Sequence, residues 1–259
     1  MTWVLDCDGV IWLGEEALPG TAEAVDRLRQ AGERVVFLTN NSYPLLEQHL
    51  AKLDRLGMST RPGDVISSAM AAARLVSPGE RALVLGGPGI FEALVGRGVE
   101  TVEAGAGAGV EAVDVVVVGF DLKFDFARLA AATSALRGGA RLVATNDDAT
   151  FPTSGGLLPG AGAFLAAVSL AGGVTAEIAG KPHEAVVDLL VERVGSVATV
   201  VGDRPSTDGR LATRLGARFA LVLTGVTPPG HGTIDPEPDI EAADLASIVD
   251  RELPPVGAS

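Results

Sequence analysis

Short apolar runs alternate with helical patterns along this chain, and each run stops at polar or glycine residues. Four such runs lie in the outer parts of the sequence: Trp3–Leu5, Val35–Leu38, Val197–Val201 and Phe219–Leu223. Helical spacing of apolar residues separates them, as in the segment from Thr21 to Ala31. Continuous apolar strands joined by helices are typical of a parallel sheet that is buried on both faces. The sequence therefore predicts a doubly wound α/β core.

A second alternating series begins after the turn Ser77-Pro78-Gly79. Its predicted strands are Ala82–Leu85, Val113–Val118 and Arg141–Ala144, and its predicted helices are Gly89–Val95, Phe124–Leu136 and a segment near Gly160–Leu170. We predict a core built from residues 1–77 and 178–259, with an α/β domain inserted at residues 78–177. Near the end of the chain, Pro228-Pro229-Gly230 predicts a loop.

Composition and charge exclude several classes of partner. The net charge is −13 and aromatic residues make up 4% of the chain, so binding to nucleic acid or to an anionic membrane surface is not expected. The one cysteine, Cys7, fits a reducing cytoplasm. The first eight residues do not form a signal peptide, and the uncharged stretch at 149–176 contains too many glycines and prolines for a membrane helix.

Two carboxylates, Asp6 and Asp8, follow the first apolar run. Residues i and i+2 at a strand end point the same way, so both would enter a pocket at the carboxyl edge of the sheet. Such a pair is costly without a cation or a shared proton; a solvated turn is the alternative. The second run ends in Thr39-Asn40-Asn41-Ser42, which could bind an anion or simply cap a helix.

A lysine and two further carboxylates follow later strands. Lys181, one of only three lysines, stands between Gly180 and Pro182 at a strand-to-helix junction, where a point charge suits phosphate; a surface lysine is the alternative. Asp203 and Asp208 follow the run Val197–Val201, and one of them could instead be a helix cap. Four carboxylates favour Mg²⁺, and Mg²⁺ with a lysine is the equipment of phosphoryl transfer.

These motifs, taken in order, resemble those of the haloacid dehalogenase-like hydrolases. The resemblance rests on Asp6-Cys7-Asp8-Gly9-Val10, Thr39-Asn40-Asn41-Ser42, Gly180-Lys181-Pro182, and Gly202-Asp203 through Thr207-Asp208. The interval of about 140 residues between the second and third motifs is similar to the subfamily with a large α/β cap. The segments Thr145–Pro152 and Leu157–Gly162 are similar to the cap of 4-nitrophenylphosphatase-like (NagD-like) enzymes.

The resemblance implies a role for each matching residue. Asp6 would be the nucleophile and a Mg²⁺ ligand, and Asp8 would be the general acid and base, with its main-chain carbonyl on the metal. Lys181 would screen Asp6 and the phosphoryl group, and Asp203 would be a further Mg²⁺ ligand. Asp208 would support the metal site without binding the ion directly. The predicted phosphate- and substrate-binding residues, besides Lys181, are Gly9, Thr39, Asn40, Asn41 and Asn146.

Several other residues carry weaker expectations. Pro205 and Gly209 depart from the commoner form of the fourth motif, which leaves the placement of Asp208 open. Strand alternation points Cys7 away from the pocket, as a buried filler. His183 is expected to be a partly exposed residue at a helix start. Specificity is assigned to the cap, at Asn146, Asp147 and the loop near Phe120-Asp121.

The predicted function is a Mg²⁺-dependent phosphomonoesterase that hydrolyses a small phosphorylated metabolite through an aspartyl-phosphate intermediate. A carboxylate at Asp8 argues against dehalogenation within this family. One alternative is a Mg²⁺-binding phosphoacceptor or regulatory module without turnover, and another is an inactive binding protein. The resemblance also implies that the cap can mediate a homodimer.

Overall fold

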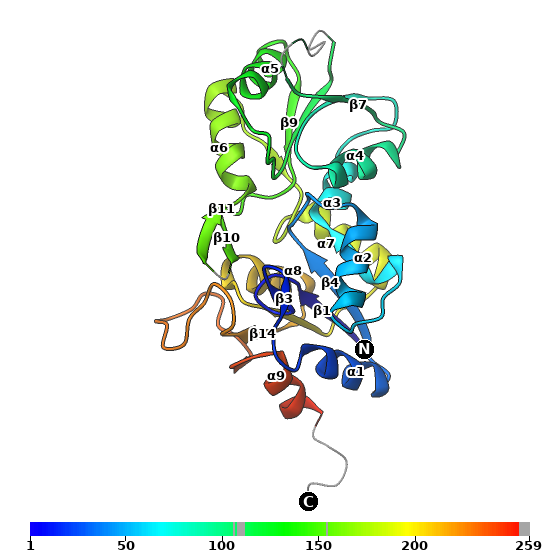
Figure 1. Cartoon of the computed structure of the whole chain (residues 1–259), viewed down its shortest axis with the longest axis vertical. Coiled ribbons are helices and arrows are strands. Elements are labelled where there is room, and N and C mark those ends of the chain that lie inside the picture. The colour runs from blue at the N-terminus through cyan, green and yellow to red at the C-terminus, as the bar shows by residue number, and fades with distance from the viewer. Residues whose placement is uncertain (106, 108–111, 154, 254–259) are drawn as a thin grey trace, which may run out of the picture.

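The chain folds into two α/β lobes that lie one above the other along the long axis of the molecule (Figure 1). The computed structural model describes residues 1–105, 107, 112–153 and 155–253. The first lobe is built from both ends of the chain. The second lobe is built from the middle of the chain, from β6 (Arg81–Leu85) to β12 (Glu177–Ile178), and joins the first lobe through two connections.

The first lobe contains a six-stranded parallel sheet. Its strand order is β15 (Ile240–Ala242), β14 (Arg218–Val222), β13 (Thr199–Gly202), β1 (Thr2–Asp6), β4 (Arg34–Thr39), β5 (Val65–Ser67). The strand β1 lies in the middle, where Leu5 pairs with Val201 on one side and with Phe37 on the other. Because the strands are parallel, their carboxyl ends meet at one edge of the sheet.

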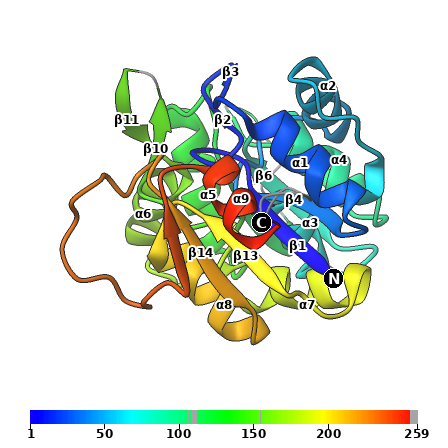
Figure 2. The same ribbon diagram turned by 90° about the horizontal axis from the view of Figure 1, so that it is seen from below.

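Helices cover both faces of this sheet, as Figure 2 shows. One face carries α1 (Thr21–Gln30), α2 (Leu46–Arg55) and α9 (Leu245–Glu252), and the other carries α3 (Ser68–Arg74), α7 (Glu184–Val194) and α8 (Arg210–Leu215). Alternate residues of β1 divide between the two layers: Leu5 packs toward α1 and α9, whereas Val4 packs toward α3 and α7. The apolar strand runs in the sequence are therefore explained by burial on both faces.

The second lobe repeats this plan with a five-stranded parallel sheet. Its strand order is β12 (Glu177–Ile178), β9 (Arg141–Ala144), β8 (Val115–Val118), β6 (Arg81–Leu85), β7 (Glu100–Glu103). One face packs on α4 (Pro88–Val95), and the other packs on α5 (Phe126–Arg137) and α6 (Ala161–Gly172). An antiparallel hairpin, β10 (Thr150–Thr153) and β11 (Gly156–Pro159), reaches from this lobe toward the first (Figure 1).

The predicted doubly wound α/β organisation is confirmed, and the differences lie in short elements. Several elements fall in stretches for which no strand or helix was predicted; they include β2 (Trp12–Leu13), β3 (Glu16–Ala17), η1 (Pro62–Asp64), β5, α3, β7, the hairpin β10–β11, β15 and α9. The predicted boundary between residues 177 and 178 falls inside β12. Ile178 pairs with Ala144, so its backbone belongs to the sheet of the second lobe.

The uncharged stretch at residues 149–176 forms the hairpin and α6. Pro152 and Pro159 stand in the two hairpin strands, which among the described residues pair only with each other and so leave room for residues without an N–H group. In the part of the chain that the structure describes, no helix is long and apolar enough to cross a membrane.

A buried ion pair fixes the loop that follows β8. Arg128 on α5 donates from Nε to Asp121 Oδ2 at 2.8 Å, and the two side chains are 7% and 2% exposed. Nearby, Lys123 contacts Glu103 at 3.3 Å, but both of these side chains are more than half exposed. The buried pair holds the loop that carries Phe120, which lines the cavity described below.

We expect Arg128→Met to lower the free energy of unfolding by roughly 3–5 kcal/mol, because Asp121 would be left buried without its cation. The matched control Lys123→Met removes a surface pair and should cost less than about 1 kcal/mol. Thermal unfolding followed by circular dichroism measures both. Equal shifts in the two variants would show that the Arg128 pair does not hold the loop.

Candidate functional site

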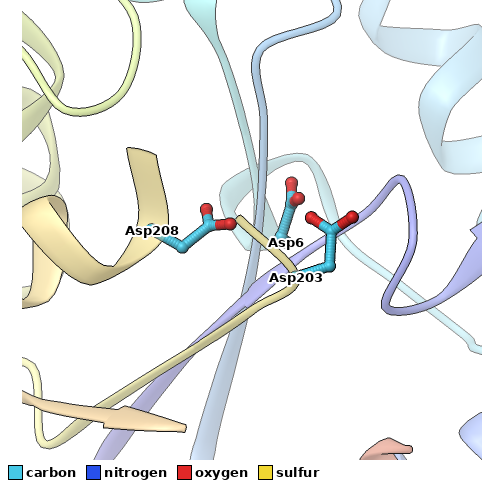
Figure 3. Close-up of side chains that lie close together, drawn as sticks. All are labelled: Asp6, Asp203 and Asp208. Atoms are coloured by element: carbon cyan, nitrogen blue, oxygen red, sulfur yellow. The ribbon is translucent and has the colours of Figure 1, made fainter. Parts of the chain in front are cut away.

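The predicted site residues converge at the carboxyl edge of the first sheet. Asp6 ends β1, Thr39 ends β4, and Asp203 follows β13. Carboxylate oxygens of Asp6, Asp203 and Asp208 lie within 4.8 Å of one another. Figure 3 shows the three side chains gathered at the strand ends, with Asp208 reaching in from the helical segment after β13. The parallel sheet thus brings together residues that are two hundred positions apart in the sequence.

Lys181 is the cation of this cluster. Its Nζ lies 2.6 Å from Asp6 Oδ1 and 2.8 Å from Asp208 Oδ1, and its side chain is 3% exposed. The Lys181 backbone N–H donates to Asn40 Oδ1 at 2.8 Å, which fixes the lysine from its main chain. The interpretation of Lys181 as a surface residue is therefore wrong.

The fourth motif places Asp208 through a short π-helix, η2 (Pro205–Gly209). Pro205 is its first residue, where a missing N–H costs nothing. Gly209 is its last, and a Cβ there would lie 2.8 Å from Pro236 and 3.0 Å from Phe219. The Asp208 carboxylate is fully buried and also accepts from the Arg204 N–H at 3.2 Å. Both departures from the commoner motif therefore serve this turn, and they leave Asp208 in place.

Asp203 is held by the chain segment that follows β14. The Val226 N–H donates to Asp203 Oδ2 at 2.5 Å, and the Thr227 hydroxyl donates to the Asp203 carbonyl at 2.6 Å. A Cβ at Gly225 would collide with the same carboxylate. Asp203 is 2% exposed.

Gly9 packs beside Asp203 and has a positive φ of 86°. A Cβ there would lie 2.5 Å from Asp203 Oδ2. The Gly9 N–H already donates to the Trp12 carbonyl at 2.8 Å. The Gly9 amide therefore closes the loop, and its missing side chain makes room for Asp203; phosphate binding by Gly9 stays a prediction.

Crowding of the carboxylates changes their acidity. Burial raises the pKa of Asp6 well above its usual range, against the opposing effect of Lys181. Burial together with the Asp208 charge raises the pKa of Asp203 to about 7. Burial alone would lower the pKa of Lys181, but Asp208 and Asp6 outweigh it and raise that pKa above its usual range. Lys181 is therefore always charged, while the acids need more positive charge than it supplies.

Asp8 stands beside Asp6 in the same cavity. Its carboxylate accepts from Trp12 Nε1 at 3.0 Å and from the Thr39 hydroxyl at 3.5 Å. Burial raises the pKa of Asp8, and the Trp12 hydrogen bond opposes the shift. The environment of Asp8 therefore favours a carboxyl that can carry a proton.

The second motif both supports the site and lines it, since Asn40 and Asn41 belong to the cavity lining. The Thr39 hydroxyl accepts from the Asn41 N–H at 3.0 Å and lies behind the cavity wall, directed at Asp8. Asn40 Nδ2 donates to Asp148 Oδ2 at 2.8 Å, while Asn40 Oδ1 accepts from Lys181. Both side chains are bonded to protein groups in this structure, and phosphate binding by Thr39 and Asn40 stays a prediction. Asn41 lines the cavity from an exposed position.

Residues of the second lobe are fastened to the site by hydrogen bonds. Asn146 Nδ2 donates to the Asn40 carbonyl at 2.7 Å, and Asn146 Oδ1 accepts from the Asp148 N–H at 3.1 Å. Asn146 lines the cavity and its amide ties the lobes together; its substrate-binding role stays a prediction.

Two residues of this fastening, Asp148 and Arg204, were missed by the sequence analysis. Arg204 Nη2 donates to the Thr150 carbonyl at 2.9 Å, and its Nη1 lies 3.6 Å from Asp148. Both side chains line the cavity. Their positions in the sequence could have indicated them, because each directly follows a predicted site residue: Asp148 follows Asp147, and Arg204 follows Asp203.

Other expected cap residues lie outside the cavity lining. Asp121 pairs with Arg128, and Asp147 contacts His183 Nε2 at 3.3 Å. Of the loop near Phe120, the phenylalanine itself lines the cavity. His183 is half-buried at the start of α7, and Cys7 is buried in the core, as expected for both.

The cluster of Asp6, Asp203 and Asp208 fits a divalent cation with oxygen ligands. All three donors are carboxylates, which hard cations such as Mg²⁺ prefer. Asp208 uses one oxygen for Lys181 and the other for the Arg204 N–H. The contacts described for the Asp6 and Asp203 carboxylates each involve a single oxygen, so these two are the pair best suited to hold the ion. Burial and the nearby Asp208 charge raise the pKa of both carboxyl groups, and a bound cation would favour their ionised forms.

Comparison with known proteins identifies the family. A family model described as haloacid dehalogenase-like hydrolase matches residues 3–100, and a HAD-hydrolase-like model matches residues 178–248. An acid sugar phosphatase from Staphylococcus aureus is 33% identical over 231 residues, 87% of each chain. The chain belongs to the haloacid dehalogenase-like hydrolases.

Solved structures of this family share both lobes with the chain. The glycerol phosphate phosphatase from Mycobacterium tuberculosis, in complex with magnesium, has a TM-score of 0.85 and 32% identity over 95% of this chain and 75% of that one. The p-nitrophenyl phosphatase from Archaeoglobus fulgidus has a TM-score of 0.85 and 27% identity over 96% and 98%. The predicted enzyme class, a phosphatase of this superfamily, is confirmed.

The raised pKa of Asp203 leads to a test of the site's charge balance. The folded chain binds the proton of the Asp203 carboxyl more tightly than the unfolded chain does. Protonation of Asp203 therefore contributes fully to the stability of the fold below about pH 4, and this contribution is lost as pH rises through about 7. In EDTA, the melting temperature of the wild type should therefore fall relative to Asp203→Asn between about pH 5 and about pH 8. If the melting temperatures of the two proteins changed with pH in parallel, the raised pKa of Asp203 would be contradicted.

Proposed function

We propose that this hydrolase is a Mg²⁺-dependent phosphomonoesterase that acts through an aspartyl phosphate on Asp6. The observation that carries the proposal is the Lys181 ammonium between Asp6 and Asp208, with Asp203 and Asp8 beside them in one cavity. A cation fixed against a carboxylate and a second acid within the same cavity are what in-line displacement at phosphorus requires.

Asp6 and Asp203 would hold the ion, and the main-chain carbonyl of Asp8 is a further ligand by resemblance to the family. Bound Mg²⁺ supplies positive charge that screens the nucleophile from the phosphate and stabilises the charge of the transition state. Asp208 stays with Lys181 and keeps that ammonium aimed at Asp6. We assign binding of the phosphoryl oxygens to the Lys181 ammonium and to the exposed side-chain amide of Asn41.

In the first step, an oxygen of Asp6 attacks phosphorus while the bond from phosphorus to the leaving oxygen breaks. Cys7 N–H and Lys181 Nζ both contact Asp6 Oδ1, at 2.8 and 2.6 Å, so Oδ2 is the oxygen assigned to the attack. Asp8 gives its proton to the departing alkoxide, which its raised pKa favours. Thr39 and Trp12 orient Asp8 for this transfer.

In the second step, Asp8 acts as a base. Its carboxylate takes a proton from water, the water oxygen attacks phosphorus, and the bond between phosphorus and Asp6 breaks. Inorganic phosphate leaves, and both aspartates return to their first protonation states. The same residue serves as acid and then as base because the two steps are related by microscopic reversibility.

A small phosphorylated metabolite is the proposed substrate. The cavity holds about 190 Å³ and is lined by residues of both lobes, so only a compact alcohol part fits above the phosphate. The names of the relatives, acid sugar phosphatase and glycerol phosphate phosphatase, support this size class.

We also propose that the second lobe acts as a cap. Its ties to the site through Asn146 and Asp148 support a roof that excludes water during transfer. The division into a core at 1–77 and 178–259 and a cap at 78–177 follows the two sheets, apart from β12. A homodimer through the cap and a cytoplasmic location stay predictions from the sequence.

Replacing Asp6 with asparagine removes the nucleophilic carboxylate but keeps a side chain of nearly the same size and shape. We expect Asp6→Asn to lower kcat by more than about a thousandfold, and excess EDTA to abolish turnover of the wild type until Mg²⁺ is restored. The matched control is Asp26→Asn, an exposed position on α1. Phosphate release from a panel of phosphometabolites measures all three.

Wild-type turnover by Asp6→Asn would refute the nucleophile assignment. A phosphorylated Asp6 that persists without release of phosphate would instead favour the regulatory phosphoacceptor. Loss of activity in Asp26→Asn would show that the assay reports damage to the fold and not loss of the nucleophile.

A further inference from the structure

Lys52 lies on α2 with its ammonium against the ring of a tryptophan. Its Nζ stands 4.2 Å from the centroid of the Trp12 ring. The Lys52 side chain is 19% exposed and Trp12 is 2% exposed, so little water reaches this contact. The quadrupole of an indole attracts an ammonium over its face, and the attraction grows where water is excluded. Lys52 and Trp12 therefore form a cation–π pair.

The N–H edge of the same indole contacts the catalytic loop. Trp12 Nε1 donates to Asp8 Oδ1 at 3.0 Å. The Trp12 main chain is bonded to this loop as well, because its N–H donates to the Cys7 carbonyl at 3.1 Å and its carbonyl accepts from the Gly9 N–H at 2.8 Å. The described lining of the cavity includes Asp8 but neither Trp12 nor Lys52. The indole therefore contacts Asp8 from outside the cavity.

The turn between β2 and β3 holds the Lys52 ammonium in place. Nζ donates to the Gly14 carbonyl at 2.6 Å and lies 3.5 Å from Glu15 Oε1. Glu15 is 76% exposed and also accepts from Arg55 Nη2 at 2.6 Å. An exposed carboxylate is screened by water and neutralises little of a neighbouring charge. The charge of Lys52 therefore acts on the indole.

The Lys52 charge and the bond to Asp8 strengthen each other through the ring. A cation over the indole draws electron density toward that face and makes the N–H a better donor. A carboxylate that accepts from the N–H returns density to the ring and strengthens its hold on the cation. Polar contacts polarise one another in this way when water is kept out. The direction of the Asp8 carboxylate is therefore linked to a lysine outside the cavity.

We propose that Lys52 is a positioning residue for proton transfer and that it acts on Asp8 through the indole of Trp12. This inference rests on the proposed phosphomonoesterase function and adds a residue that does not touch the substrate. Because Trp12 binds Oδ1 of Asp8, the proton is assigned to Oδ2, whose contact with the Thr39 hydroxyl is longer, at 3.5 Å. Loss of the Lys52 charge weakens the bond to Oδ1 and so misdirects Oδ2.

The leaving group of the substrate tests this role. Glycerol 3-phosphate releases an alkoxide that needs the proton of Asp8, whereas 4-nitrophenyl phosphate releases a phenolate that needs little protonation. The value of kcat/KM depends only on the steps up to release of the alcohol, so it reports Asp8 as an acid. With Mg²⁺ present, we expect Lys52→Met to lower kcat/KM about 3- to 10-fold for glycerol 3-phosphate and less than about twofold for 4-nitrophenyl phosphate.

The matched control is Arg55→Met. It removes a positive charge from the same helix and from the same partner, Glu15, but leaves the pair of Lys52 and Trp12 intact. Both esters should keep the kcat/KM of the wild type in this variant. An equal loss on both esters in Lys52→Met would overturn the proposal, because a lysine that only supports the fold slows them alike. A selective loss in Arg55→Met would overturn it too.

A double-mutant cycle shows whether Lys52 acts through the indole. Trp12→Phe keeps a ring but removes the N–H that bonds to Asp8, and it should lower kcat/KM for glycerol 3-phosphate by about threefold or more. In that background, Lys52→Met should cost less than about twofold, because residues that act through one contact are not additive. Two losses that simply multiply would overturn the role of the indole.

Indole NMR gives a second readout that needs no turnover. The chain has two tryptophans, so protein labelled at the indole nitrogen gives one N–H signal for Trp12 and one for Trp3. A weaker bond to Asp8 should move the Trp12 proton upfield in Lys52→Met and leave Trp3 unchanged, while Arg55→Met should move neither signal. An unmoved Trp12 signal in Lys52→Met would overturn the proposal even if neither ester were hydrolysed. Failure to hydrolyse either ester or the wider panel would instead count against the proposed function.

Discussion

The buried ammonium of Lys181 is the constraint on which the site depends. Three carboxylates within 4.8 Å of one another, all largely withdrawn from water, repel each other strongly. Lys181 offsets part of this repulsion through contacts of 2.6 and 2.8 Å to Asp6 and Asp208. Burial and the Asp208 charge still raise the pKa of Asp203 to about 7, and a divalent cation at this edge of the sheet would supply the positive charge that favours its ionised form.

The surrounding fold serves to hold these charges together. Parallel pairing of β1 with β13 and β4 brings the strand ends to one edge. Close approaches are possible only at glycine: a Cβ at Gly202 would collide with Asp208, and one at Gly225 would collide with Asp203. Asn40 then joins Lys181 to Asp148 of the second lobe, so that the roof and the charged cluster are one hydrogen-bonded unit.

The sequence predicted what local patterns encode and missed what tertiary contacts decide. Apolar runs that end in polar residues predicted β1, β4 and β13 and the positions of Asp6, Lys181 and Asp203. The hairpin β10–β11 was missed because Pro152 interrupts its strand pattern and because it pairs only with itself. The bonds that Asn40 and Asn146 make depend on packing between the lobes and leave no local signal in the sequence.

Chemical trapping of the enzyme during turnover tests the central claim most directly. The Asp8→Asn variant should form the phosphoenzyme from phenyl phosphate, whose leaving group needs little protonation, but hydrolyse it slowly for lack of a base. Borohydride reduction followed by peptide mass spectrometry should then find Asp6 converted to homoserine, and no other carboxylate changed. Modification of a different residue, or none while phosphate is still released, would contradict a mechanism centred on Asp6.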